Sequence, residues 1–466
     1  MTAAELAPAR RVVPVAAAVG TNLVLLALLV GGGALSVLAL VVIVGVGLWI
    51  SARPQRGILL LVALAPFDGL LLLVPHPTIV NGWKEALTLV TLAATFVAPA
   101  SARARARIGR PVWVEPLVGL VVVSLASAAV VRGLPAVIGL KIGFFYVLAA
   151  WAIWRCPLGA RERDRMVTIL LAGGIITAAY GLAQQVIGAP GLVRLGYQYN
   201  TTVRFAGSFL RSFSTFVQPF GFGFYLMAVV LITLPGALRD PRRLRSRVLF
   251  WSLPLLTAGI LSTLVRGAWL GLAVGVVYLG AARYRSLLLL LPLAAAAVLL
   301  LPSDAASSAL SSNSTSQRAA GWSQNLHEVV RHPVGAGVGS SGASAEKLAE
   351  LGRAGRPVYQ PDNQYFLTLY ELGPLGLWML ALLLWAAFTV CRAAARSQAG
   401  ADGDLALGAT AFVVAAAAAS TVASFLQIFP MDVLWWVLLA AVAGLPLTAE
   451  RPAPVAQPAS PSPGRP

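Results

Sequence analysis

The sequence has little charge, few histidines and almost no cysteine. Only 11% of its 466 residues are charged, whereas soluble domains carry roughly 25%. With 58% hydrophobic residues and a mean hydropathy of +0.80, the composition excludes a soluble globular protein. The two cysteines, Cys156 and Cys391, both fall outside the longest polar segment, so no disulfide is expected to staple it. Three histidines and these two cysteines offer no credible metal cluster, and we predict no metal site and no cofactor.

Long apolar runs fill most of the chain. A run of about 20 apolar residues is enough to cross the hydrocarbon core of a bilayer. Because these runs are continuous and do not alternate, they predict helices and exclude a β-barrel. The sequence therefore predicts an all-α polytopic membrane protein with about 12–14 transmembrane helices, the lower number applying if short neighbouring runs merge. The expected spans are 12–30, 34–50, 57–75, 84–100, 112–131, 136–154, 166–187, 206–235, 248–264, 267–282, 286–301, 362–390, 405–427 and 431–448.

The formal net charge of +18 follows from membrane topology and does not indicate a nucleic-acid-binding surface. Most arginines fall in short loops on one side, as the positive-inside rule requires if both termini are cytoplasmic. We expect residues 1–11 to be a cytoplasmic N-terminus, followed by a first span that is retained. We expect transmembrane helices over 12–301 and 362–448, and a Pro-rich, disordered cytoplasmic tail over 449–466.

The longest polar segment, about 302–361, is predicted to be an extracytoplasmic loop with short amphipathic helices. Residues 317–331 have the spacing of one such helix, with Trp322 at the level of the lipid headgroups. Arg318 and His332 fall on one stripe of that helix, and His332-Pro333 is expected to end it. The glycines that follow, from Gly335 to Gly342, match a dinucleotide fingerprint only formally, because no strand precedes them. They predict tight turns that bring the backbone close to the membrane or a ligand.

Three arginines stand at the predicted outer ends of spans, where the positive-inside rule does not expect them. Arg204 and Arg211 are seven residues apart, which would place them on one helical face, and Arg266 lies between two apolar runs. A guanidinium near hydrocarbon costs roughly 2.5–3.5 kcal/mol. One such arginine is more simply explained by snorkelling to the headgroups. Three of them at one membrane face, beside the long loop, favour a clamp for a lipid diphosphate.

Acidic residues near the loop allow two interpretations. Asp362-Asn363 opens the span after the loop, where it is typical of a helix N-cap, or it supplies a carboxylate that accepts a proton from a sugar hydroxyl. Glu371 lies nine residues further on, too deep to share the surroundings of Asp362 directly. Glu371 and Asp68 are candidates for function, and pairing with neighbouring helices explains them equally well.

The order of these motifs resembles the O-antigen ligase and polymerase superfamily of bacterial envelope proteins. The resemblance covers mainly residues 200–380. It is carried by Arg204 with Phe205-Ala206-Gly207-Ser208-Phe209, Arg266-Gly267-Ala268-Trp269, Arg318 and Trp322, His332-Pro333-Val334-Gly335-Ala336-Gly337-Val338-Gly339, Asp362-Asn363-Gln364-Tyr365-Phe366 and Glu371-Leu372-Gly373-Pro374-Leu375-Gly376. The family usually has His-Asn where this chain has Asp362-Asn363, a departure that favours polymerase over ligase.

The resemblance implies a metal-independent glycosyltransferase that uses a polyprenyl-diphosphate-linked glycan at the outer face of the bacterial cytoplasmic membrane. By that analogy Asp362, Arg266 and Arg211 are catalytic, and transfer inverts the anomeric centre. Substrate would be bound by Arg204, Arg318, Asn363, Trp322 and His332. The implied partners are a lipid-linked oligosaccharide donor, a glycan acceptor, the lipid bilayer and other envelope-polysaccharide assembly proteins. The competing hypothesis is a flippase for lipid-linked glycans that makes no glycosidic bond.

Overall fold

The computed structural model describes residues 34–74, 78–98, 111–199, 202–289, 326–352 and 359–445, and these are almost entirely helical. The α-helices are α2 (Ala34–Ala52), α3 (Gln55–Leu64), α4 (Trp83–Val97), α6 (Val114–Val131), α7 (Gly133–Phe144), α8 (Val147–Arg155), α9 (Ala160–Arg194), α10 (Pro219–Arg239), α11 (Leu244–Ser262), α12 (Arg266–Ala282), α16 (Gly342–Glu350), α17 (Gln364–Ser397), α18 (Gly400–Ala419) and α19 (Met431–Ala443). Short 3-10 helices are η1 (Ala65–Leu73), η2 (Thr78–Gly82), η3 (Arg285–Leu289) and η4 (Phe425–Gln427). The two strands are β1 (Arg204–Ala206) and β2 (Phe209–Arg211).

The helices confirm an all-α polytopic membrane protein. Within the described residues, 7 helices are long and apolar enough to cross a membrane, and the bent pair α7 and α8 makes an eighth. Three shorter apolar helices, Val41–Ala52, α12 and α19, accompany them. The expected span over 136–154 is this bent pair, with 45° between its halves. The expected span over 12–30 and most of that over 286–301 lie outside the described residues.

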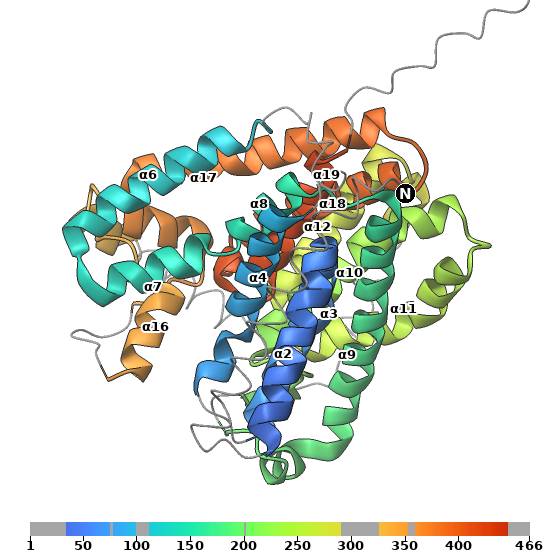
Figure 1. Cartoon of the computed structure of the whole chain (residues 1–466), viewed down its shortest axis with the longest axis horizontal. Coiled ribbons are helices and arrows are strands. Elements are labelled where there is room, and N and C mark those ends of the chain that lie inside the picture. The colour runs from blue at the N-terminus through green and yellow to red at the C-terminus, as the bar shows by residue number, and fades with distance from the viewer. Residues whose placement is uncertain are drawn as a thin grey trace, which may run out of the picture.

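The core is built around α10, α18 and α19, which are buried along most of their length. Helices α9, α11, α12 and α17 pack around them. Figure 1 shows α6, α7, α16 and part of α17 extending to one side of this body. Helix α17 links the two parts, since it packs against both α18 and α6.

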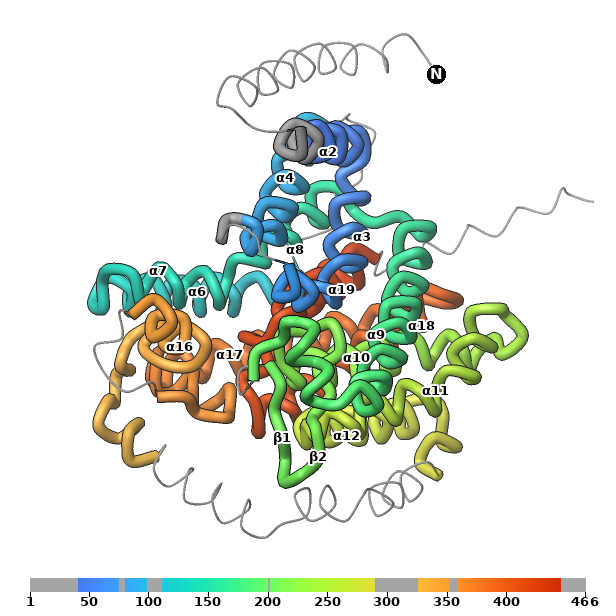
Figure 2. The backbone as a smooth tube through the Cα atoms, turned by 90° about the horizontal axis from the view of Figure 1, so that it is seen from below, coloured from blue at the N-terminus to red at the C-terminus, as the bar shows by residue number. Residues whose placement is uncertain are grey.

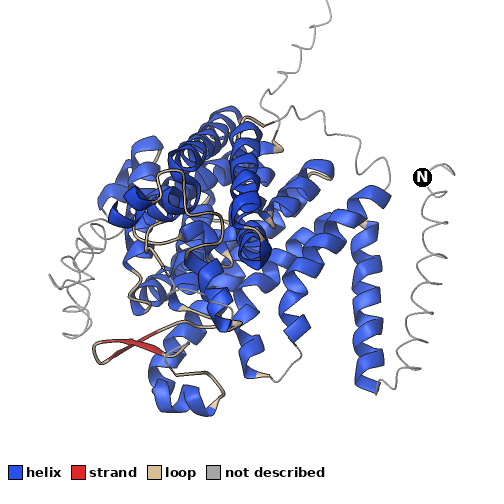
Figure 3. Ribbon diagram, turned by 90° about the vertical axis from the view of Figure 1, so that its left-hand side faces the viewer, coloured by secondary structure: helices blue, strands red, loops and turns tan. Residues whose placement is uncertain are grey.

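The expected helix over 206–235 is wrong at its start, because α10 begins only at Pro219. The preceding residues form an antiparallel β-hairpin, in which Arg204 pairs with Arg211. Gly207 and Ser208 make its two-residue turn, and Gly207 has a φ of +61°, which suits glycine in such a turn. The hairpin lies beside the N-terminal ends of α10 and α12 in Figure 2 and at the edge of the molecule in Figure 3.

The glycine-rich segment after His332 does form tight turns, but its backbone contacts neighbouring helices. Gly335, Gly337 and Gly339 all have positive φ. A Cβ on Gly339 would lie 2.1 Å from the Pro135 carbonyl oxygen, and one on Gly335 would lie 2.5 Å from that of Glu371. The segment is therefore wedged between α7 and α17, which fixes the position of α16 just after it.

Candidate functional site

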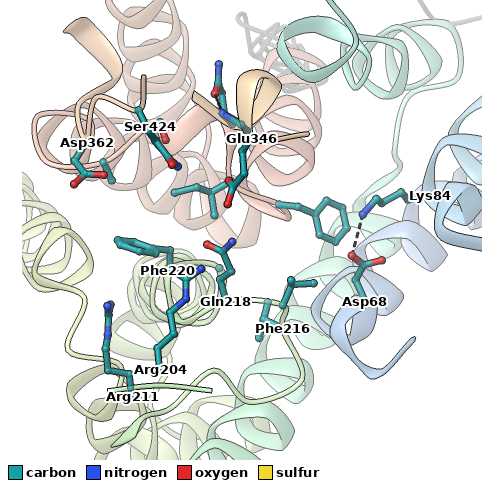
Figure 4. A pocket seen from close by; sticks show the side chains of 18 residues that line it. Asp68, Lys84, Arg204, Arg211, Phe216, Gln218, Phe220, Glu346, Asp362 and Ser424 are labelled. Atoms are coloured by element: carbon teal, nitrogen blue, oxygen red, sulfur yellow. Dashed lines mark hydrogen bonds and ion pairs between the residues drawn. The ribbon is translucent and has the colours of Figure 1, made fainter. Parts of the chain in front are cut away.

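A cavity of about 550 Å³ opens between the β-hairpin, the start of α10, η1, α16 and the entry to α17. Its lining is Asp68, Lys84, Arg204, Arg211, Phe216, Val217, Gln218, Phe220, Gly221, Ala343, Glu346, Gln360, Asp362, Ala423, Ser424, Gln427, Ile428 and Phe429. Figure 4 shows the arginines on one side of it, Asp362 and Glu346 across from them, and Asp68 with Lys84 further along. A cavity of this size with few aromatic and many polar side chains suits a polar ligand such as a glycan.

The hairpin arginines are held in place by polar residues of α9. The Gln184 side chain accepts hydrogen bonds from the backbone N–H groups of Phe213 and Ser214 at 3.1 and 2.8 Å. It also donates to the Ser214 carbonyl oxygen at 2.9 Å. The neighbouring Gln185 donates to the Leu210 carbonyl oxygen at 2.8 Å. The Gln185 bond occupies a backbone group of β2, and the Gln184 bonds hold the segment just after it, so the strand carrying Arg211 has a fixed position.

Arg211 is tied to the end of α11. Its Nε donates to the Thr263 carbonyl oxygen at 3.0 Å, and its guanidinium lies 5.3 Å from the centre of the Phe220 ring. Carbonyl groups at a helix C-terminus carry partial negative charge, which favours a cation there. Burial, followed by the like charges of Arg204 and Arg266, lowers the pKa of Arg211 to about 10. We call Arg204, Arg211 and Arg266 the arginine cluster.

The members of the cluster do not all reach the cavity. Arg204 and Arg211 line it, whereas Arg266, the first residue of α12, is close enough to affect Arg211 electrostatically but is not part of the lining. The cluster therefore places positive charge on one side of the cavity, where Arg204 and Arg211 are part of the lining.

Asp362 and Asn363 have separate roles. Asn363 is the N-cap of α17, accepting from the N–H groups of Tyr365 and Phe366 at 2.8 and 3.2 Å. Its Nδ2 donates to the Thr421 carbonyl oxygen at 2.8 Å. Both ends of the amide are thus hydrogen-bonded within the protein, and Asn363 is not part of the cavity lining. The cap predicted for this pair thus belongs to Asn363, and Asp362 is exposed and lines the cavity.

Other expected site residues lie elsewhere. His332 is not part of the cavity lining, and its ring packs edge-on against Tyr370 with centroids 5.4 Å apart. Arg318 and Trp322 lie outside the described residues. Glu371 is buried and lines a smaller cavity of about 70 Å³. In the part of the chain that the structure describes, no group of three or more His, Cys, Asp or Glu side chains could hold a metal ion.

The cavity also contains Asp68, a candidate from the sequence, and residues that were not expected there. Asp68 accepts from Trp83 Nε1 at 2.8 Å and forms a 2.9 Å ion pair with Lys84. It is brought to the cavity because Gly69 lets η1 approach the backbone of Phe216, where a Cβ would lie 2.4 Å from the carbonyl carbon. An acid inside an apolar run was the signal for Asp68. The sequence gives no comparable signal for Gln218, Glu346 or Gln427.

The fold and the cavity define a multi-span helical membrane protein with a polar pocket at one end of its helices, lined by two arginines on one side and by carboxylates across from them. Residues 251–381 match the family described as O-antigen ligase. This match confirms, over that segment, the resemblance to the O-antigen ligase and polymerase superfamily. The matched segment includes Arg266, Glu346 and Asp362, whereas the hairpin precedes it. No curated protein matches the chain. The matched family implies glycan transfer of the O-antigen ligase or polymerase type at the cell envelope.

Proposed function

We propose that the protein transfers glycan from a polyprenyl-diphosphate-linked donor to a sugar hydroxyl at the outer face of the cytoplasmic membrane. The observation that carries this proposal is the arginine cluster beside a polar cavity. Arg204 and Arg211 enter that cavity from opposite strands of one hairpin. Guanidinium groups match the oxygens of a diphosphate bidentately and keep their charge at neutral pH.

The start of α10 supports the same ligand. Its N-cap Gln218 makes no side-chain capping bond, and Gln218, Phe220 and Gly221 line the cavity. Backbone N–H groups at a helix N-terminus favour an anion, and the helix dipole adds to that preference. Two arginines and this helix end therefore make one wall of the cavity suited to a diphosphate.

The reaction follows from the charge arrangement. The acceptor hydroxyl oxygen attacks the anomeric carbon opposite the diphosphate, and the carbon–oxygen bond to the leaving phosphate breaks with inversion. Arg211 and Arg204 stabilise the negative charge that develops on the diphosphate, and Arg266 adds to the positive potential. Such electrostatic stabilisation is often the largest contribution to catalysis. Asp362, on the far side of the cavity, orients the acceptor or removes its proton.

Polymerisation is favoured over ligation because Asp362-Asn363 stands where the family usually has His-Asn. The test uses the purified protein in proteoliposomes with a lipid-linked repeat unit. A ladder of longer lipid-linked glycans supports a polymerase, and a single transfer to a different acceptor identifies a ligase. Movement of the lipid across the bilayer with no new glycosidic bond would overturn the proposal in favour of a flippase. The inactive control is Arg211→Ala in the same vesicles.

A further inference from the structure

Glu346 is a third carboxylate of the cavity, beside Asp68 and Asp362, and it comes from α16. Figure 4 shows its side chain between Asp362 and the Asp68–Lys84 pair, on the side of the cavity facing Gln218 and the arginines. It is half-buried. Ala343, three residues earlier on the same helix, also lines the cavity. Residues three apart share a helical face, so this face of α16 forms part of the cavity wall.

A buried network fixes the N-terminus of α16. Glu371 Oε1 accepts from both the backbone N–H and the hydroxyl of Ser341, each at 3.0 Å. The Gly342 N–H donates to the Tyr359 carbonyl oxygen at 3.0 Å, and the Ala343 N–H donates to Gln427 Oε1 at 3.2 Å. A carboxylate at this end of a helix also complements the helix dipole. Glu371 is thus a positioning residue that anchors α16 one turn before Glu346.

The three carboxylates differ in their surroundings. Asp68 is engaged through both oxygens, by Trp83 and by Lys84, and its charge is neutralised there. Asp362 is exposed at the entry to α17. Glu346 makes no hydrogen bond or ion pair with any other residue in the described ranges, while its neighbours Lys347 and Glu350 pair with each other at 2.6 Å outside the cavity. Glu346 therefore combines a fixed backbone with a carboxylate directed at ligand space.

We propose that Glu346 is the general base, taking the proton of the acceptor hydroxyl as its oxygen bonds to the anomeric carbon. This assignment rests on the proposed function. The oxygen–hydrogen bond of the acceptor breaks and its proton moves to the Glu346 carboxylate. The anomeric carbon–oxygen bond breaks and its electron pair leaves with the diphosphate. Glu346 then releases the proton to water. In this arrangement Asp362 binds the acceptor and takes no proton from it.

The experiment compares Glu346→Gln with Glu350→Gln, which removes a carboxylate from the same helix outside the cavity. Both are assayed for glycosidic bond formation from a lipid-linked repeat unit in proteoliposomes. We expect Glu346→Gln to lower kcat about 10²- to 10⁴-fold with an unchanged KM for the donor. Glu350→Gln should remain within about twofold of wild type, since its pair with Lys347 is on the surface. Glu346→Asp should recover part of the rate.

The pH dependence of kcat distinguishes a general base from a residue that has only a structural role. In wild type, kcat should fall at low pH as the carboxylate becomes protonated, and Glu346→Gln should lose this acid limb while keeping the thermal stability of wild type. If wild type forms glycosidic bonds and Glu346→Gln retains both the wild-type rate and the acid limb, the assignment is overturned and the proposed function stands. If wild type itself forms no bond from the donor, the proposed function fails first.

Discussion

The arginines at the two ends of the helix bundle have different interaction partners. At the end where α9 begins and α10 finishes, Arg163 pairs with Asp402 at 2.6 Å. There also, Arg245 pairs with Asp164 at 2.8 Å and Arg239 contacts the buried Asp404. At the cavity end, Arg211 makes no ion pair within the described residues. Its partners are the Thr263 carbonyl oxygen and the Phe220 ring. Arginines that pair with carboxylates stabilise the fold, whereas an arginine surrounded by like charge is available for an anionic ligand.

The largest difference between the two ends is expected in catalysis. Arg211→Ala with Arg266→Ala removes two charges of the cluster, and each loss of such stabilisation costs roughly 10²- to 10³-fold in rate. We expect at least a thousandfold loss of glycan transfer in the double variant, measured with a lipid-linked donor at saturating concentration. Full activity in this variant would refute the diphosphate clamp.

At the opposite end of the bundle, removing an arginine should lower the stability of the fold and leave the reaction rate almost unchanged. Among the described residues, Arg239→Gln leaves Asp404, whose side chain is 4% exposed, with Arg283 at 3.9 Å as its remaining ion-pair partner. We expect a loss of about 1–3 kcal/mol, below the value for a fully buried pair because the Arg239 side chain is 34% exposed. Thermal unfolding in detergent measures this loss, and the rate per folded molecule should stay within about twofold of wild type. Equal losses of activity at both ends would show that the two groups of arginines do not differ in their role.

The pH dependence of anion binding should identify Arg211. Because its pKa is lowered to about 10, Arg211 loses its charge at a lower pH than an ordinary arginine, and affinity for inorganic pyrophosphate should fall as the pH rises through about 10. In Arg204→Gln one like charge is gone, so the pKa of Arg211 rises and the fall moves to higher pH. A fall that stays at the same pH in this variant would contradict the assignment to Arg211.

The lowered pKa of Arg211 also affects the stability of the fold. Removing Arg239 should destabilise the protein, whereas removing Arg211 should not. The pKa of Arg211 lies below its ordinary value of 12.5, so the unfolded chain binds more protons between about pH 10 and 12.5, and stability rises with pH in that window. Below it, the charge on Arg211 opposes folding. Arg211→Gln should therefore leave the Tm at neutral pH unchanged or higher, while activity is lost.

The smallest effect is expected at the hairpin turn. Gly207 has a φ of +61°, where a β-branched residue costs roughly 1–2 kcal/mol. Gly207→Val should disturb the pairing of Arg204 with Arg211 and raise the KM for the donor about three- to tenfold with little change in kcat. Gly207→Asn tolerates this conformation and serves as the matched control. Equal KM values for the two variants would show that the hairpin pairing does not matter for donor binding.

The spans could be predicted from the sequence because continuous apolar runs have no soluble alternative, and the three arginines stood out against the positive-inside rule. The hairpin could not, since two strands of three residues are too short for an alternating pattern and Gly207-Ser208 fits a helix of small residues equally well. The glutamines that fix it, Gln184 and Gln185, lie inside an expected span with no local sign of a distant partner.

The carboxylate side of the cavity was predicted only in part. Asp362 stood out because it follows the long loop. Which of Asp362 and Asn363 caps the helix and which lines the cavity depends on the contact of Asn363 with Thr421, 58 residues away. Glu346 is brought to the cavity by the bond between Ser341 and the buried Glu371. Neither contact has a periodic pattern in the sequence, because both arise from tertiary packing.

The most direct test of the clamp is binding of farnesyl diphosphate, measured against farnesol, to the purified protein in detergent. Arg204→Gln with Arg211→Gln is compared with Arg243→Gln with Arg245→Gln, which removes two arginines paired with Asp164 at the other end of the bundle. We predict that the first double variant loses at least a hundredfold in affinity for the diphosphate, that the second keeps wild-type affinity, and that farnesol binding is the same in all three proteins. Wild-type affinity for the diphosphate in the first variant would contradict the account.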